Sequence, residues 1–274
     1  MTRSWLDRYL ARLGLDRDLP PTIDTLARLH RAHLERIAYE NLDIHLGEEL
    51  PLGEEAAVAK LVGHGRGGWC YEMNACFGWA LRELGFTAHY AAGTVRRRVA
   101  EPVPEGNHLV IIVDLDRRYL ADVGFGNGLL EPVPLEEGCY RQDGFEVRLA
   151  READRWIVLF GHEGSDNRFD LTVTPRPLPW FAAECRRLQT DPASPFVRRT
   201  VCHRLVGGGF VTLRGAVLTR TTPRGVTSRV VADADDYVDT LRDGFGLDLP
   251  EARQLWPTVM ERHLAWTAET REVG

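Results

Sequence analysis

The sequence predicts an α+β protein in which helices come first and strands follow. Up to about residue 84, apolar residues recur at the spacing of amphipathic helices. From about residue 86 to 215, short apolar runs of strand length follow one another, with one short helical stretch among them. The remainder adds strands and closes in helices. A doubly wound α/β protein would alternate the two kinds of element along its length, so this order favours α+β.

Three helices are expected in the first region. "WLDRYLARLG" (residues 5–14) and "TIDTLARLHRAHLERI" (residues 22–37) each place their apolar residues on one face, and Gly14 ends the first. A third helix begins at Cys70 and ends at Gly85. The apolar stripe of the second helix is expected to contain Ile23, Leu26, Leu29, His33, Leu34 and Ile37.

The strand-like runs of the second region are bounded by turn residues. They are "FTAHYAAGTV", "HLVIIVDL", "RYLADVGF", "FEVRLA", "RWIVLF" and "FDLTVTP". A short helix, "PWFAAECRRLQ", interrupts them, and the third region contributes "GAVLTR" and "GVTSRVV" before the last helices, which start at "DADDYVDTLRDGFG".

Composition excludes several classes of protein. The net charge of −6 argues against nucleic-acid binding, which usually relies on a basic surface. No stretch approaches the ~20 apolar residues of a membrane span, and the N-terminus lacks the apolar core of a signal peptide, so a cytoplasmic protein is expected. Five cysteines without a Cys-x-x-Cys pair favour neither a disulfide framework nor a structural zinc site.

Cys70 stands where the third helix begins, directly after Gly67, Gly68 and Trp69. A free thiol has a pKa of about 8.5, and the positive partial charge of a helix N-terminus lowers it. The two glycines permit a closer approach than a Cβ would allow. The alternative is a buried structural cysteine, which is the prediction for Cys76. A nucleophilic Cys70 would need a base and a group that orients the base.

A candidate base and its partner lie on a predicted β-hairpin. The apolar runs on either side of the turn at residues 114–118 pair so that facing residue numbers sum to about 230 to 232. His108 then lies opposite Asp122 or diagonal to it, with both side chains on one face. A lone carboxylate among small apolar residues is costly. Taken singly, the two are a core histidine and a strand-end cap; taken with Cys70, they indicate a Cys–His–Asp triad.

The chain also resembles the arylamine N-acetyltransferases. The resemblance rests on "IAYENLDIHLG", "RGGWCYEMN", "NHLVIIV" and "YLADVGFGNG", with further support from "PASPF", "GAVLT" and "LRDGFGLDL". It implies an N-terminal helical bundle that carries the cysteine (1–85), a central β-barrel that carries the histidine and aspartate (86–200), and a C-terminal α/β lid (201–274). It also implies a core similar to that of papain-like and transglutaminase-like cysteine enzymes.

The mechanism that the resemblance implies is ping-pong transfer without a metal. Cys70 takes the acetyl group from acetyl-coenzyme A, the donor substrate, and coenzyme A leaves. An arylamine, arylhydrazine or N-hydroxyarylamine then accepts the acetyl group. His108 keeps the thiol ionised and later accepts a proton from the amine, while Asp122 fixes the tautomer of the imidazole.

Other positions carry over from the family with less specific roles. The expected contacts of coenzyme A are Asn107, Gly124 and Gly126. The expected lining of the acceptor pocket is Tyr39, Val95 and Phe125. Arg66 is expected to pair with Glu40, near Asn41, and to join the first two regions. The basic run from Arg96 to Arg98 is interpreted as a solvated face rather than a phosphate site.

Three alternatives remain at this stage. An amide synthase that closes a polyketide chain into a macrolactam would share the triad. A thiol hydrolase or transglutaminase-like enzyme would use water or lysine as the acceptor. A non-catalytic binding module is disfavoured, because all three triad residues are present.

Overall fold

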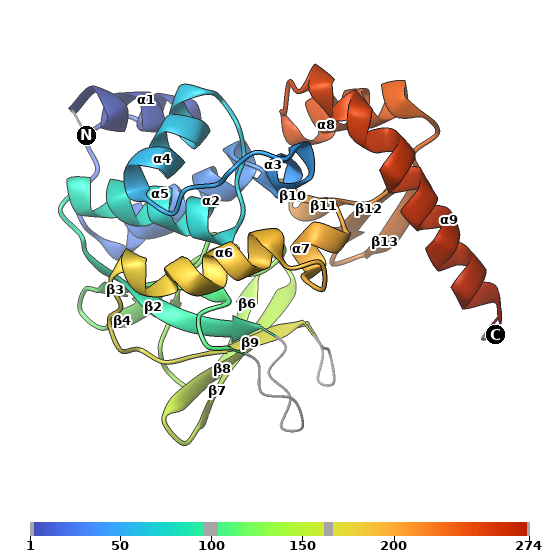
Figure 1. Cartoon of the computed structure of the whole chain (residues 1–274). Helices are drawn as coiled ribbons and strands as arrows, with labels where there is room; N and C mark the ends of the chain where they lie inside the picture. Colours follow the sequence, from blue (N-terminus) through green and yellow to red (C-terminus); the bar gives the residue numbers. More distant parts are fainter. Residues whose placement is uncertain (1–2, 96–103, 162–166, 273–274) are drawn as a thin grey trace.

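The structure is a computed structural model that describes residues 3–95, 104–161 and 167–272. It confirms the α+β class: an N-terminal group of helices, an antiparallel sheet curled into a nearly closed barrel, and a second sheet with the C-terminal helices (Figure 1). The order of these parts along the chain is the order that the hydrophobic patterns predict.

The N-terminal helices follow the predicted stripes closely. They are α1 (Arg3–Leu13), α2 (Ile23–Arg36), α3 (Leu42–Leu46), α4 (Glu54–Val58), the π-helical turn η1 (Ala59–Gly63) and α5 (Cys70–Glu83). Gly14 and Gly85 adopt positive φ angles of 72° and 86° just past the ends of α1 and α5, as expected for glycines that terminate helices. The prediction that Ile23 belongs to the apolar stripe of α2 was wrong, because this residue is 36% exposed where the helix begins.

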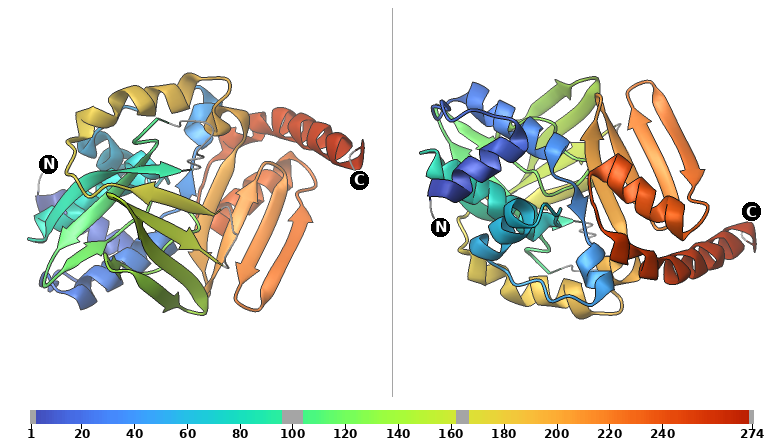
Figure 2. Two further views of the ribbon diagram at one scale, coloured as in Figure 1. Left: turned by 90° about the horizontal axis from the view of Figure 1, so that it is seen from below. Right: turned by 90° about the horizontal axis from the view of Figure 1, so that it is seen from above.

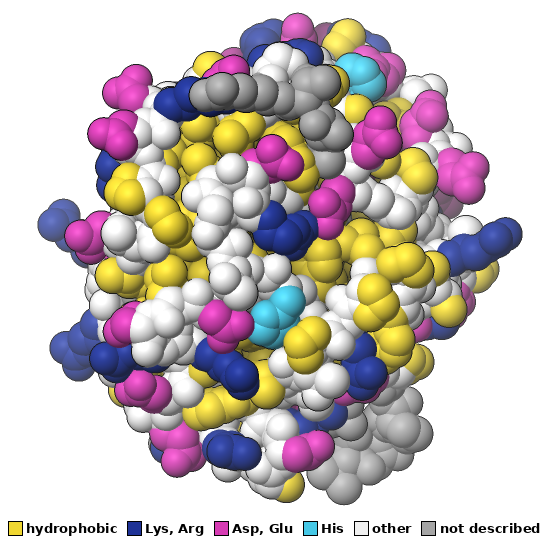
Figure 3. All heavy atoms as spheres, turned by 90° about the vertical axis from the view of Figure 1, so that its left-hand side faces the viewer, with side chains coloured by type: hydrophobic (Ala, Val, Ile, Leu, Met, Phe, Trp, Pro, Cys, Tyr) yellow, Lys and Arg dark blue, Asp and Glu magenta, His cyan; other side chains and the backbone are white. Residues whose placement is uncertain are grey.

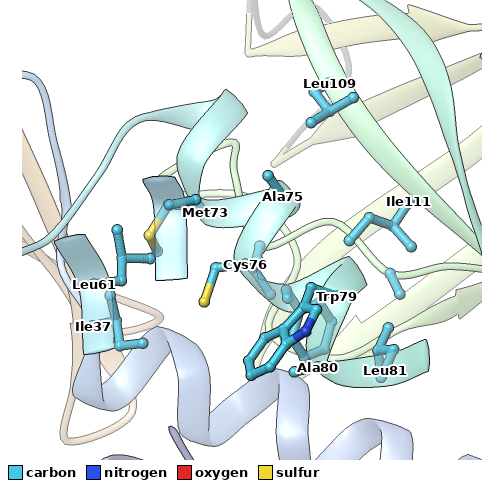
Figure 4. Packing of buried hydrophobic residues seen from close by; sticks show 14 of the residues in the cluster. Ile37, Leu61, Met73, Ala75, Cys76, Trp79, Ala80, Leu81, Leu109 and Ile111 are labelled. Atoms are coloured by element: carbon cyan, nitrogen blue, oxygen red, sulfur yellow. The ribbon is translucent and has the colours of Figure 1, made fainter. Parts of the chain in front are cut away.

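Helix α5 lies at the centre of the molecule and is buried on almost all sides. Its apolar residues pack against both the other helices and the barrel: Figure 4 shows Cys76 and Trp79 of α5 among Leu61, Leu109 and Ile111. Cys76 is therefore the structural cysteine that was predicted. Packing of this density leaves α5 little freedom to shift, and Cys70 is its first residue.

Within the described residues, the barrel is built from eight strands. They are β2 (Thr87–Val95), β3 (His108–Asp114), β4 (Arg118–Leu120), β5 (Val133–Pro134), β6 (Gly138–Gln142), β7 (Phe145–Glu152), β8 (Arg155–Phe160) and β9 (Arg168–Leu171), in the spatial order β5-β4-β3-β2-β9-β8-β7-β6. The Gln142 side chain on one edge strand hydrogen-bonds the backbone of Leu130 and Glu131, next to the other edge strand. Side-chain hydrogen bonds thus connect the two edges of the sheet, which share no backbone hydrogen bonds in the strand order given.

The second sheet has five strands in the order β1-β10-β11-β12-β13. They are β1 (Tyr39–Glu40), β10 (Val201–Val206), β11 (Gly209–Arg214), β12 (Val217–Thr222) and β13 (Gly225–Val230). Strands β10 and β11, which pair from Val201 opposite Arg214 to Val206 opposite Gly209, were not among the predicted strands. Strand β1 comes from the N-terminal region, so the first and third parts of the chain share one sheet.

The remaining helices cover the second sheet and connect it to the barrel. They are η2 (Leu178–Phe181), α6 (Ala182–Thr190), α7 (Pro195–Arg198), α8 (Ala234–Phe245), η3 (Pro250–Leu255) and α9 (Trp256–Glu272). Helix α8 packs on the sheet through Tyr237, Leu241 and Phe245, whereas α9 runs outward along the edge of the molecule (Figures 1 and 2).

The surface shows no concentration of one charge on the face drawn in Figure 3, where acidic and basic side chains are interspersed. None of the helices in the described part of the chain combines the length and the apolar character that crossing a membrane requires.

Candidate active site

Cys70 begins α5 and is 2% exposed. The glycines before it are required by the close approach of strand β1: the Gly68 amide donates to the Ala38 carbonyl at 3.1 Å, and the Gly68 carbonyl accepts from the Glu40 amide at 2.8 Å. A Cβ on Gly67 would lie 2.6 Å from the Glu40 side chain. The tight approach predicted from the two glycines therefore exists, but its partner is β1 and its effect is to fix where α5 starts.

The surroundings of the sulfur differ from the expectation. Burial raises the pKa of the Cys70 thiol above its usual value, and the charges of Cys185 and Asp122 act in the same direction. Backbone hydrogen bonds from Leu109 and Tyr71 oppose this rise. The N–H groups of the helix start do lower the pKa, but they are outweighed by burial, so an ionised Cys70 requires a cationic partner close by.

His108 and Asp122 are in contact, as the hairpin argument predicts. His108 Nε2 lies 2.7 Å from Asp122 Oδ2, and both residues are buried. Strands β3 and β4 pair with Ile112 opposite Leu120, a register sum of 232, which places the two side chains diagonally on one face. Because Nε2 is used by Asp122, Nδ1 is the ring nitrogen that remains for the thiol. The backbone of Leu109, the next residue after His108, acts to lower the pKa of the Cys70 thiol.

The expectation that the second hairpin strand runs to Phe125 was wrong, because β4 ends at Leu120. Beyond it, side chains replace the ladder: the Val123 amide donates to Asn74 Oδ1 at 3.1 Å, and the Gly124 amide donates to Asp122 Oδ1 at 2.8 Å. The chain leaves the sheet at the point where Asp122 takes up these bonds.

Asp122 is held by more groups than the sequence revealed. Its Oδ1 also accepts from Asn74 Nδ2 at 2.7 Å, and its backbone carbonyl lies 3.1 Å from His30 Nε2. Burial alone would raise the pKa of Asp122, but the charge and hydrogen bond of His108, with those of Asn74 and Gly124, hold it below its usual value. Asp122 is therefore a carboxylate, the form that can support an imidazolium.

The predicted acceptor residues lie on three different elements. Phe125 packs edge-on to the His108 ring at a centroid distance of 5.6 Å and stacks on Phe160 at 4.9 Å. Tyr39 is buried in β1, 5.5 Å from the ring of His203. Val95 ends β2. Of these three, Phe125 is the residue that the structure places directly against the triad.

The residues expected to contact coenzyme A already have other partners. Both functional groups of the Asn107 amide bond the backbone of Val95, at 2.7 and 3.1 Å. The Gly124 amide is used by Asp122, and a Cβ there would lie 2.9 Å from the Cys70 carbonyl. Gly126 has a φ of 88° and lies against the ring of His203. The run from Arg96 to Arg98 lies outside the described residues.

Close to the start of α5 is a largely buried group of five ionisable side chains. Arg66 Nη2 contacts Glu40 Oε1 at 2.8 Å, as predicted, and also Asp43 Oδ1 at 2.6 Å. Lys60 Nζ contacts Asp43 Oδ2 at 2.7 Å and Glu72 Oε1 at 2.9 Å, while Glu72 Oε2 accepts from the Trp69 amide at 3.2 Å. Since Glu40 is in β1, the pair joins the helices to the C-terminal sheet, so the expectation that it joins the first two regions was wrong.

A cavity of about 400 Å³ lies between the C-terminal sheet and α9. Its lining includes Asn127, two residues after Phe125, together with the cationic and aromatic side chains of Arg199, Arg214, Arg262 and Trp266. A neighbouring hollow of about 580 Å³ shares those last four residues. They come from separate segments of the sequence, which is why no local motif indicated them.

Residues 3–95, 104–161 and 167–272 contain no group of three or more His, Cys, Asp or Glu side chains placed to bind a metal ion. The described site contains the groups for acyl transfer through a thiol, namely a nucleophile, an imidazole and a carboxylate.

Comparisons with known proteins point to one family. The sequence model of the N-acetyltransferase family matches residues 22–254. The arylamine N-acetyltransferase of Mycolicibacterium smegmatis is 35% identical, over 89% of this chain and 92% of that protein. The arylamine N-acetyltransferase / N-hydroxyarylamine O-acetyltransferase of Salmonella typhimurium is 33% identical, over 91% of each. The structure of the Mycobacterium marinum arylamine N-acetyltransferase in complex with CoA superimposes with a TM-score of 0.85 at 30% identity, over 93% of this chain and 97% of that one. The chain belongs to the arylamine N-acetyltransferase family and is an acyltransferase.

Proposed function

We propose that this protein acetylates arylamines, arylhydrazines and N-hydroxyarylamines through an acetyl thioester on Cys70. The observation that carries the proposal is the convergence of three residues from separate elements: His108 is bonded to Asp122, and Gly124, two residues after Asp122, approaches so closely that a Cβ there would lie 3.0 Å from Cys70 Cα. Nucleophile, base and orienting acid are the parts that a thiol acyltransferase requires.

In the first half-reaction the Cys70 proton moves to His108, and the resulting ion pair compensates for burial of the thiolate. The sulfur attacks the carbonyl carbon of acetyl-coenzyme A, the bond from that carbon to the sulfur of coenzyme A breaks, and the departing thiolate takes the proton from His108. Asp122 supports the imidazolium while it carries the proton.

In the second half-reaction the nitrogen of the acceptor attacks the carbonyl carbon of the acetyl-enzyme. His108 takes a proton from that nitrogen, and the bond from carbon to Sγ of Cys70 breaks. Phe125, edge-on to His108 and stacked on Phe160, supplies apolar ring surface against which an aryl group can pack. Tyr39 and Val95 complete this pocket in the proposal.

The donor requires a second binding region, because coenzyme A ends in several phosphates. The cavity lined by Arg199, Arg214 and Arg262 offers the matching charge, and it begins at Asn127, near the triad segment. We assign the nucleotide end of the donor to this cavity, with the pantetheine arm passing Gly124 and Gly126.

Intact mass spectrometry tests the proposal. Mixing the protein with acetyl-coenzyme A alone should add one acetyl group on Cys70, and an arylamine should then remove it as the N-acetylated amine. Cys70→Ser should fold but turn over poorly, whereas Cys139→Ser is the matched control, since Cys139 is an exposed thiol.

Three outcomes would contradict the proposal. Loading of Cys139 with Cys70 unmodified would remove Cys70 from the chemistry. Release of free acetate in the presence of an arylamine would indicate a thiol hydrolase. Failure to take acetyl while accepting longer acyl thioesters would favour an amide synthase.

A further inference from the structure

Asn74 lies one helical turn after Cys70 on α5, so the two side chains project from the same side of the helix. Its exposed fraction is 0%. Its amide nitrogen donates to the Leu109 carbonyl at 2.6 Å and to Asp122 Oδ1 at 2.7 Å, and its oxygen accepts from the Val123 amide at 3.1 Å. One side chain therefore reaches both arms of the segment that carries the histidine and the aspartate.

The orientation of the Asn74 amide is fixed by its partners. A carbonyl and a carboxylate only accept hydrogen bonds, and the Val123 amide only donates one, so a flipped side chain would face a mismatch at all three contacts. Both N–H groups and the oxygen are used. Because every donor and acceptor of the Asn74 amide is used, its side chain has one favoured orientation and keeps its three partners in fixed positions.

Leu109, the residue after His108, is held by α5 through its carbonyl, which accepts from Asn74. Gly124, on the other arm, is so close to α5 that a Cβ there would lie 3.0 Å from Cys70 Cα. Both arms are thus positioned against the helix that carries the nucleophile.

We propose that Asn74 is a positioning residue for acetyl transfer, which sets the direction of the Asp122 carboxylate, and through it of the His108 ring, relative to Cys70. The inference rests on the triad roles proposed above. Asn74 touches neither the acetyl group nor the acceptor in this proposal; it acts by holding Asp122, Leu109 and Val123 in register with α5.

Asn74→Asp is the decisive variant because it keeps the size and shape of the side chain but replaces a donor with an acceptor. The new carboxyl would lie at hydrogen-bond distance from Asp122 Oδ1, and two carboxylates so close share a proton. At low pH the shared proton restores a donor to Asp122. As the pH rises that proton is lost, and repulsion turns the two carboxylates apart. The ionisable groups that face this pair in the described part of the chain are Cys70 on α5, His30 on α2, Tyr39 on β1 and His108 on β3.

The experiment measures the rate of acetyl-enzyme formation for wild type and Asn74→Asp across pH. We expect the ratio of wild-type rate to variant rate to be small at about pH 5.5, roughly threefold, and to exceed roughly thirtyfold at about pH 8.5. Asn74→Ala, which introduces no charge, should lower the rate by a constant factor. The matched control is Asn41→Asp, since Asn41 is another buried asparagine whose amide bonds backbone groups away from the triad.

The inference would be overturned if the ratio of wild-type rate to Asn74→Asp rate did not change with pH. It would also be overturned if the corresponding ratio for Asn41→Asp changed with pH by as much. If Asn74→Asp does not fold, a wild-type rate in Asn74→Ala would overturn it equally. Failure of wild type itself to form an acetyl-enzyme would refute the proposed function instead, so the two failures are distinguishable.

Discussion

The carboxylate of Asp122 accepts hydrogen bonds from three donors, which are His108, Asn74 and the Gly124 amide. A carboxylate in a dry site is stable only when it is bonded to this degree. In the proposed mechanism, its negative charge supports His108 while that ring carries the proton taken from Cys70. The state of the nucleophile therefore depends on a residue that does not contact it in the proposed mechanism.

Asp122→Asn should move the alkylation profile of Cys70 to higher pH. The variant keeps the side-chain shape but loses the charge that supports the imidazolium, so the thiolate loses its counter-ion. The corresponding change in serine proteases costs about 10⁴ in rate, and we expect a loss of acetyl transfer well beyond about tenfold.

The measurement for Asp122→Asn is iodoacetamide alkylation against pH, with Cys139→Ser as the background to remove the exposed thiol. Asp116→Asn is the control, because Asp116 is an exposed aspartate on the turn of the same hairpin. Superimposable profiles for wild type and Asp122→Asn would show that Asp122 is not the orienting acid.

Glu72→Gln should change how stability depends on pH. Burial raises the pKa of Glu72 from 4.5 to about 7, with Lys60 and the Trp69 amide opposing that rise. The folded protein thus binds this proton more tightly than the unfolded chain, and the resulting stabilisation is complete below about pH 4.5 and is lost as the pH rises through about 7. Relative to wild type, Glu72→Gln should gain up to about 3 kcal/mol in unfolding free energy across that window.

Chemical denaturation of wild type and Glu72→Gln at several pH values checks this prediction. Glu83→Gln, at the exposed end of the same helix, should show no such window. A constant difference between wild type and Glu72→Gln from pH 4 to 8 would contradict the assigned titration.

At the scale of residues, the sequence could predict those relations that depend on local pattern. The contact of His108 with Asp122 follows from even numbers on two strands of one hairpin, and the place of Cys70 follows from the glycines before it. Asn74 and Lys60 could not be found in this way. Asn74 binds Asp122, which is 48 residues away in the sequence, and Lys60 binds Asp43, which is 17 residues away. Neither residue type is distinctive within a helical pattern.

Among the elements, α5 and the β3–β4 hairpin determine the site, and their positions depend on β1. This strand has two residues, yet it pairs with β10 along one edge and contacts Gly68 along the other. An alternation of apolar and polar residues can be recognised only over several residues, so strands as short as β1 and β5 cannot be predicted from it. The early end of β4 was missed for a related reason, since "YLADVGF" reads as a strand until Asp122 and Val123 are known to have side-chain partners.

Arg66→Ala should destabilise the junction of β1, α3 and α5. The Arg66 side chain is 16% exposed and pairs with Glu40 and Asp43, which would be left as buried carboxylates without this cation. Removing one partner of such a group costs roughly 3–5 kcal/mol. Thermal and chemical unfolding measure the loss, and Arg117→Ala serves as the control because Arg117 pairs on the surface. Equal midpoints for the two variants would refute a structural role for Arg66.

For the molecule as a whole, residues around β1 help to connect its first and last parts. Asn41 donates to the carbonyls of Phe196 and Arg199, both at 2.9 Å, and accepts from the Val201 amide at 2.7 Å. It was expected near a link between the helices and the barrel, but it binds the segment that leads into the C-terminal sheet. The class and the order of the three parts were predictable from hydrophobic pattern; this sharing of a sheet was not, because it joins residues about 160 positions apart.

Asn41→Asp should therefore loosen the C-terminal sheet without changing the pH dependence of acetyl-enzyme formation. A carboxylate would still accept from the Val201 amide but could not donate to the carbonyls of Phe196 and Arg199, and each hydrogen bond lost costs about 0.5–1.5 kcal/mol. Limited proteolysis should show faster cleavage between residues 191 and 200. Unchanged proteolysis together with a reduced acetylation rate would instead indicate that Asn41 belongs to the active site.

The scarcity of lysine affects how readily the protein's own side chains could be acylated. Lys60 is the single lysine in a chain whose other basic side chains are arginine and histidine. An amine is acylated only in its unprotonated form, and although burial alone would lower the pKa of Lys60, the carboxylates of Glu40, Glu72 and Asp43 raise it above its usual value. A protein that handles a reactive thioester thus presents almost no side-chain amine that could be acylated by accident. Amine-directed labels should attach chiefly at the α-amino group, which would give uniformly oriented protein on an amine-coupled surface.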